Sequence, residues 1–358
     1  MQHRDGMHRS WLAAVLIVGL IVSPSWAIDQ VLRKSSTTPI RGTISAVSKT
    51  GVTVKRQVGG DMMIPANDIR DIRWDGEPVK LISARAADRA SRFEQALSFY
   101  ADAAKDPKAS GANIKLDLQF LVARATAGKA LAGAGSLEEA RQKLEGFLQV
   151  GANSCRYYNA VALLGQVELA AGGHDKAKTQ FEVLAKAPWL DYQLAGSSSL
   201  ARVLLAKDDV DGALAAFTAV VTQAGNDTSP AVKTQRFEAV LGKSTCLIRK
   251  KNQASYQAAL GDLAGVINGA TDSSTRVLAE AYLRRGDCLR LLGRQKEAVL
   301  SYLHVDLLFA NESVLHAESL FHLGTLWSAV GHPERASSAR ERLRSDYPQS
   351  SWAKKLGS

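Results

Sequence analysis

The pattern of hydrophobic and polar residues changes once along the chain. Between residues 28 and 80, apolar residues recur at every second position in short runs, such as Gly42–Ser48 and Gly51–Gln57, with turn residues between the runs. Together with DQVLRK, GDMMIPA and DIRDIRW, these runs predict four or five short strands, a content typical of a small β-barrel or bent sheet. After Pro78 the apolar residues recur at helical spacing almost to the end of the chain.

Within the helical part, pairs of small residues recur twelve positions apart. A first helix needs a small residue where a second helix crosses it closely, and the second helix needs one at the same crossing. The pairs are Gly128 with Ala140, Gly165 with Ala177, Gly242 with Ala254, Gly286 with Ala298, Gly324 with Ala336 and, more weakly, Ala201 with Ala213 and Ala84 with Ala96. We therefore predict seven helix pairs, in which the Arg-Gly-Asp tripeptide at 285–287 is packed rather than displayed as an adhesion signal.

The second helices share further features. A large apolar or aromatic residue follows most of the alanines by four positions, and a proline ends several of these helices. This pattern resembles the tetratricopeptide repeat (TPR) over residues 81–352. The resemblance implies a mainly α protein: a TPR-like α-α superhelical solenoid preceded by the small β-barrel-like domain, which itself resembles SH3-like and Sm-like barrels. The last copy is also similar to the TPR regions of exported bacterial envelope proteins.

The first residues have the order of a secretory signal. Arg4 and Arg9 precede twelve apolar residues, Trp11–Val22, and Ser25 and Ala27 occupy the small positions of a cleavage site. A membrane span needs about 20 apolar residues. We predict a signal peptide over 1–27, a β domain over 28–80, a solenoid over 81–352 and a tail over 353–358, without a transmembrane span after cleavage. Export would place the protein in the periplasm or cell envelope; an uncleaved N-terminal anchor is the alternative.

Charge and the resemblance together suggest a partner. The formal net charge is +10, but the basic residues are interleaved with acids, and no nucleic-acid partner is expected. In TPR proteins the first helices line a concave groove that binds a peptide or helix. The residue after each small position is expected near this groove: Arg85, Lys129, Gln166, Arg202, Lys243, Asp287 and Thr325. Four of the first five are basic, which predicts an acidic partner segment; ordinary solvated charges are the alternative.

Motifs for catalysis and metal binding do not occur. The sequence has no His-Glu-x-x-His, no Gly-rich phosphate loop and no nucleophile elbow. Cys155, Cys246 and Cys288 are too far apart to suggest a metal site. We expect no cofactor, no metal and no catalytic residue. The sequence thus predicts a non-enzymatic envelope adaptor; the alternatives are a self-associating structural subunit and a cell-wall- or glycan-binding β domain carried on a TPR spacer.

Overall fold

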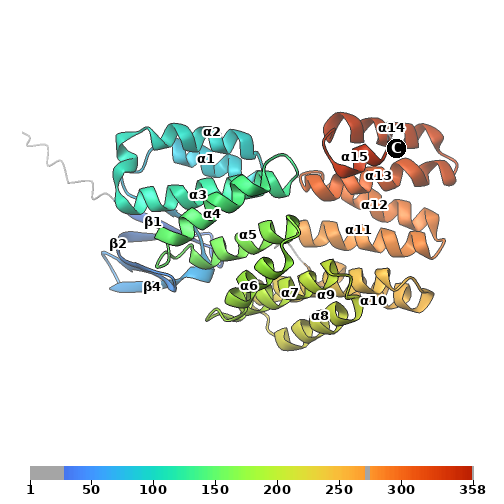
Figure 1. Ribbon diagram of the computed structural model, residues 1–358, viewed down its shortest axis with the longest axis horizontal. Coiled ribbons are helices and arrows are strands. Elements are labelled where there is room, and N and C mark those ends of the chain that lie inside the picture. Colours follow the sequence, from blue (N-terminus) through green and yellow to red (C-terminus); the bar gives the residue numbers. More distant parts are fainter. Residues whose placement is uncertain (1–27, 271–274, 357–358) are drawn as a thin grey trace, which may run out of the picture.

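A computed structural model describes residues 28–270 and 275–356. A small antiparallel sheet is followed by helix pairs that wind into a superhelix, with the sheet at one end of the long axis (Figure 1). The predicted signal peptide over residues 1–27 lies outside the described residues. None of the helices in the described part of the chain has the length and hydrophobicity of a membrane span.

The sheet is five-stranded with the order β4-β3-β2-β1-β5, and every neighbouring pair is antiparallel. The longest strand, β2, pairs with both β1 and β3, and its register shifts between Ile44 and Ala46. The predicted strand runs correspond to β1 (Asp29–Arg33), β2 (Ile40–Ser48), β3 (Gly51–Lys55), β4 (Asp61–Pro65) and β5 (Ile69–Arg73), with the 3₁₀ turn Ala66–Asp68 before β5. The prediction of a small N-terminal β unit is confirmed.

Seven helix pairs and a short last helix follow in the described ranges, which confirms the TPR-like solenoid. Each first helix packs against the second helix of its own pair and of the preceding pair. The pairs are α1 (Lys80–Arg89) with α2 (Phe93–Ala104), α3 (Ala112–Leu131) with α4 (Leu137–Val150), α5 (Tyr157–Ala170) with α6 (His174–Ala185), α7 (Leu190–Ala206) with α8 (Val210–Ala224), α9 (Pro230–Arg249) with α10 (Gln253–Gly269), α11 (Thr275–Leu291) with α12 (Gln295–Leu308), and α13 (Ser313–Ala329) with α14 (Pro333–Asp346). The last helix is α15 (Ser351–Lys355), which spans the predicted boundary between the solenoid and the tail.

The alanines of the repeat pattern are buried in every pair except one. Ala96, Ala140, Ala177, Ala213, Ala298 and Ala336 are all fully buried. Each stands three residues after the first residue of its helix, so the first turn of the second helix meets the first helix at the same place. At Gly128, Gly165 and Gly286 an aromatic ring fills the space that a Cβ would need: a Cβ on Gly165 would lie 2.4 Å from Cε1 of Phe181.

The fifth pair corrects the predicted register. Ala254 is exposed and lies in the first turn of α10, whereas Ser244 and Tyr256 are both buried. Ser244 and Tyr256 keep the separation of twelve, and Tyr256 has the position, three residues after the start of its helix, that alanine has elsewhere. The predicted pair, Gly242 with Ala254, is therefore two residues out of register. The reason is that α9 extends seven residues beyond Gly242, whereas the other first helices end five or fewer residues after their small position.

The sheet and the first helix pairs share one hydrophobic core. Val31 and Ile72 from the sheet belong to the same buried cluster as Leu81 of α1 and Phe120 of α3. Asn67, next to β5, also donates to Asp191 at the start of α7, with 2.9 Å between Nδ2 and Oδ1. The boundary at residue 80 remains a prediction, but the sheet depends on the helices for part of its buried surface.

The C-terminal end of the solenoid is closed by an aromatic cluster around His322. The imidazole stacks on Tyr302 with 4.8 Å between ring centroids, and Trp352 of α15 packs beside it at 5.6 Å. Asp287 Oδ1 lies 3.6 Å from Nε2 of His322. Burial lowers the pKa of His322 to about 4; Asp287 opposes this shift, and Arg290 adds to it.

We expect His322 to make the solenoid sensitive to acid. Below pH 6.5 an unfolded chain protonates this histidine, but the folded protein does so only near pH 4. The free energy of unfolding should therefore fall as the pH drops from 6.5 to 4, by roughly 3 kcal/mol. Urea unfolding of wild type and His322→Gln at pH 7 and pH 4.5 tests this, and the advantage of wild type over the variant should shrink by about 2–3 kcal/mol at pH 4.5. An advantage independent of pH would contradict it.

Candidate functional site

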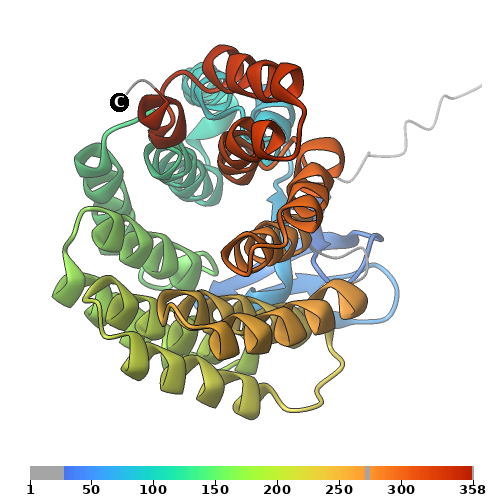
Figure 2. The same ribbon diagram turned by 90° about the vertical axis from the view of Figure 1, so that its right-hand side faces the viewer.

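The superhelix encloses one large cavity of about 1280 Å³. Viewed from the C-terminal end, the helices form a nearly closed ring (Figure 2). The cavity is lined by the start of α2, by α3, α5, α7, α9 and α11, and by residues 311–315 at the start of α13. The first helices of six successive pairs thus contribute side chains to one space, as expected for the concave face of a solenoid.

The lining combines apolar and charged side chains. Leu163 of α5 and Leu205 of α7 belong to it, and Phe181 and Phe217 reach it from the second helices behind. Phe217 also lies against Gly242, where a Cβ would stand 2.3 Å from Cε1 of the ring. The apolar area is therefore held in place by close helix crossings.

Three of the seven predicted groove residues line this cavity: Lys129, Gln166 and Arg202. Lys129 Nζ lies 3.1 Å from Oε1 of Glu94, whose side chain is exposed. Arg202 Nη2 lies 3.5 Å from Oε2 of Glu238, with both side chains partly exposed. Gln166 is exposed between them on α5. These side chains are positioned to meet a molecule in the cavity.

Lys243 and Thr325 lie outside the cavity lining. Lys243 pairs with Asp262 of α10, with 2.9 Å between Nζ and Oδ2. The two-residue displacement in α9 explains this placement, because the residue that follows Ser244 is Thr245, and Thr245 does line the cavity. Thr325 is exposed, and its hydroxyl donates to the carbonyl oxygen of Phe321 one turn earlier.

Asp287 and Arg85 are buried, which corrects their assignment to the groove. Asp287 accepts a hydrogen bond from the hydroxyl of Tyr302 at 2.8 Å and pairs with Arg284 at 2.6 Å. The sixth and seventh first helices contribute only their N-terminal ends to the cavity, so the positions after Gly286 and Gly324 lie too far along them. Arg85 faces the sheet instead, since α1 packs beside it.

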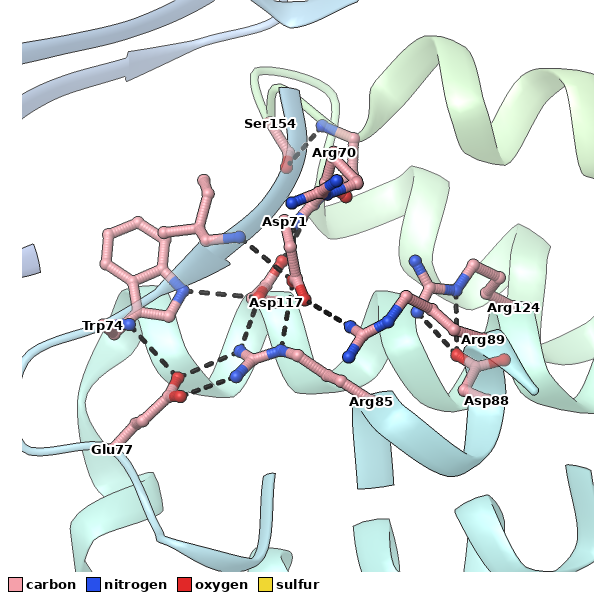
Figure 3. Close-up of polar contacts among 12 residues, drawn as sticks. Arg70, Asp71, Trp74, Glu77, Arg85, Asp88, Arg89, Asp117, Arg124 and Ser154 are labelled. Carbon is pink, nitrogen blue, oxygen red and sulfur yellow. Dashed lines mark hydrogen bonds and ion pairs between the residues drawn. The ribbon is translucent and has the colours of Figure 1, made fainter. Parts of the chain in front are cut away.

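Arg85 belongs to a buried ionic cluster that joins the sheet to the first helix pairs (Figure 3). Its guanidinium contacts three carboxylates: Asp71 of β5 at 3.1 Å, Glu77 at 2.6 Å and Asp117 of α3 at 3.4 Å. Arg156, just before α5, places Nε 2.9 Å from the other oxygen of Asp117. The indole of Trp74 also donates to Asp117 at 3.3 Å.

The core of the cluster is closed to solvent, and its charges balance when Arg89, which contacts Asp71 from the half-exposed edge, is included. Arg85, Arg156, Asp71, Glu77 and Asp117 each have less than a tenth of the side chain exposed. Burial alone would raise the pKa of Asp117, but Arg156 and Arg85 hold it below its usual range. Every carboxylate is occupied by protein donors, so the cluster fixes the sheet on the solenoid and offers no ligand site.

Several cavity residues were missed by the sequence analysis. They are charged and lie N-terminal to the small positions: Arg92, Glu94, Glu238, Arg276, Glu280 and Glu312. The sequence analysis assigned only the residue after each small position to the groove. It could not find these six, because each first helix presents side chains from two or three turns to a wide concave face. Among the described residues, no group of three or more His, Cys, Asp or Glu side chains could hold a metal ion.

Comparison with known proteins agrees with this architecture. No family model and no curated protein matches the chain. Its structure is similar to that of a Rap protein complexed with competence and sporulation factor, at a TM-score of 0.51 and 16% identity over 78% of this chain and 77% of that chain. Two further similar structures are a tetratricopeptide repeat protein from Parabacteroides merdae (TM-score 0.45, 12% identity, 79% and 99% covered) and PilW, a widely conserved type IV pilus biogenesis factor (0.44, 15%, 69% and 100%). The fold is therefore a TPR-like solenoid.

Proposed function

We propose that this protein is a non-catalytic adaptor that binds a segment of a partner protein in the cavity of its solenoid. The observation that carries the proposal is a cavity of about 1280 Å³, lined by the first helices of six successive pairs. A space of this size is large for a small cofactor and suits a peptide or a helix. The Rap protein of similar fold is complexed with competence and sporulation factor, which supports a binding role for this fold.

The partner segment carries acidic groups toward Lys129 and Arg202. These two cations and Gln166 come from α3, α7 and α5, so they form a row across neighbouring helices. Their present partners, Glu94 and Glu238, lie on other helices and are partly or largely exposed. A carboxylate of the partner would compete with exposed ion pairs, which contribute little stability on their own.

Export to the cell envelope is part of the proposal and rests on the sequence of residues 1–27. The alternatives stated above remain predictions. Self-association is favoured by one observation: Leu300, Leu307 and Leu308 on α12 are more than half exposed. A glycan-binding unit made of residues 28–80 alone is disfavoured, because the sheet shares its core and its buried carboxylates with the helices.

Photo-crosslinking from inside the cavity tests the proposal. With p-benzoylphenylalanine at Gln166, irradiation in the native envelope should yield one dominant crosslinked partner, and mass spectrometry should map the crosslinks to one contiguous segment of it. The matched control places the same group at Gln257, which is exposed on α10 outside the cavity. Equal crosslinking from both positions, or none from Gln166, would contradict binding in the cavity.

A further inference from the structure

The charges that line the cavity are separated along the superhelix. The part formed by α2, α3, α5 and α7 carries the bases Arg92, Lys129 and Arg202 and one acid, Glu94. The part formed by α9, α11 and the start of α13 carries the acids Glu238, Glu280 and Glu312 and one base, Arg276. The sheet-side helices α2 and α3 and the C-terminal helices α11 and α13 lie toward opposite ends of the long axis (Figure 1).

We infer that the cavity takes a bipolar peptide segment, with acidic residues at one end, basic residues at the other and apolar residues between them. The inference rests on the proposed function and states the chemistry of its partner. A uniformly acidic segment would gain attraction at Lys129 and Arg202 but would meet Glu280 and Glu312 at the other end. A uniformly basic segment would be attracted to Glu280 and Glu312 but repelled by Lys129 and Arg202. Like charges brought together in a partly enclosed cavity weaken binding.

The apolar residues of the lining place the hydrophobic part of the partner. Leu163, Phe181, Leu205 and Phe217 come from α5 to α8, between Lys129 of α3 and Glu280 of α11, and Arg202 of α7 lies among them. Apolar side chains there would be removed from water, which supplies binding energy, whereas the charged ends fix the direction of the segment. The cavity thus selects for the order of residues as well as for their composition.

Existing ion pairs do not remove this separation. Glu94 neutralises Lys129 locally, and Glu238 lies 3.5 Å from Arg202 at the border between the two parts. Glu312 accepts a hydrogen bond from Thr275 at 2.8 Å through Oε1, which positions its carboxylate at the start of α13. Each part therefore keeps an excess of two charges of one sign among its lining residues.

Selection from a random dodecapeptide library displayed on phage tests the inference on the full chain. Wild type should enrich peptides with segregated charges. Lys129→Glu/Arg202→Glu gives both parts of the lining a net negative charge and should enrich basic peptides, while Glu280→Lys/Glu312→Lys gives both parts a net positive charge and should enrich acidic peptides. A labelled peptide enriched on wild type should bind each double variant at least tenfold more weakly in 50 mM NaCl, with circular dichroism showing that the variants remain folded.

The outcomes separate the inference from the proposed function. Thr245→Trp, which places a large ring in the cavity from α9, is the blocking control. Enrichment of uniformly charged or neutral peptides that Thr245→Trp no longer binds would overturn the charge inference and leave cavity binding intact. Enrichment on wild type no greater than on Thr245→Trp would contradict cavity binding itself, and the inference with it.

Discussion

Replacing Arg156 by methionine is expected to lower the free energy of unfolding by about 3–5 kcal/mol, since removing one partner of a buried ion pair leaves an uncompensated charge. Arg156 is fully enclosed and contacts Asp117 at 2.9 Å and Asp71 at 3.7 Å. Without it, Asp117 keeps only Arg85 as an ion-pair partner, and Asp71 keeps Arg85 and the half-exposed Arg89. Because these residues come from β5, α1, α3 and the start of α5, the loss should loosen the sheet from the first helix pairs.

The matched control is Arg89→Met. Arg89 also contacts Asp71, at 3.3 Å, but half of its side chain is exposed, so its removal should cost less than about 1 kcal/mol. Urea unfolding followed by circular dichroism measures both variants. Similar midpoints for Arg156→Met and Arg89→Met would contradict a structural role for the cluster.

Gly286→Ala should destabilise the protein by about 1–3 kcal/mol, although alanine is the better helix former. A Cβ at this position would lie 2.6 Å from Cε1 of Tyr302, which is fully buried. If the ring moves, its hydroxyl loses the 2.8 Å hydrogen bond to Asp287 and leaves a buried carboxylate with one partner fewer. Overpacking and the lost hydrogen bond therefore act in the same direction.

Gly261→Ala is the control of opposite sign. Gly261 lies inside α10, and no atom lies within 4 Å of the position that its Cβ would occupy. Alanine should therefore stabilise the helix by up to about 1 kcal/mol. Thermal unfolding of both variants measures the contrast, and a melting temperature for Gly286→Ala at or above that of wild type would refute the packing at this crossing.

The sequence was sufficient for the architecture because its signals are local. Alternation every second residue predicts a strand wherever one face is buried, and the separation of twelve between small residues follows from the length of a helix end, a turn and a helix start. The same separation of twelve predicted that the Arg-Gly-Asp tripeptide is packed inside a helix pair, and Gly286 and Asp287 are indeed both buried. These features depend on neighbours within one helix pair, which the sequence contains in order.

The site was harder to predict, because it depends on contacts between distant segments. Arg85 has the right position in its repeat, but the first solenoid helix packs on the sheet, and no local signal shows that Asp71 and Asp117 approach it. The predicted register of the fifth pair was wrong by two residues because both Gly242 and Ser244 are small enough for the helix crossing. Only the length of α9, which the sequence pattern does not give, distinguishes the two positions. The acidic end of the cavity was not predicted, because only the residue that follows each small position was assigned to the groove, and the acidic residues lie elsewhere on their helices.

The central claim is that a partner segment lies against the first helices of the solenoid. Hydrogen exchange, measured with and without a synthetic peptide of the segment crosslinked from Gln166, tests it most directly. The account predicts slower exchange in α3, α5, α7 and α9, which line the cavity, with little change in the outer helices α4 and α10. Protection confined to the β-sheet or to the outer helices would contradict it.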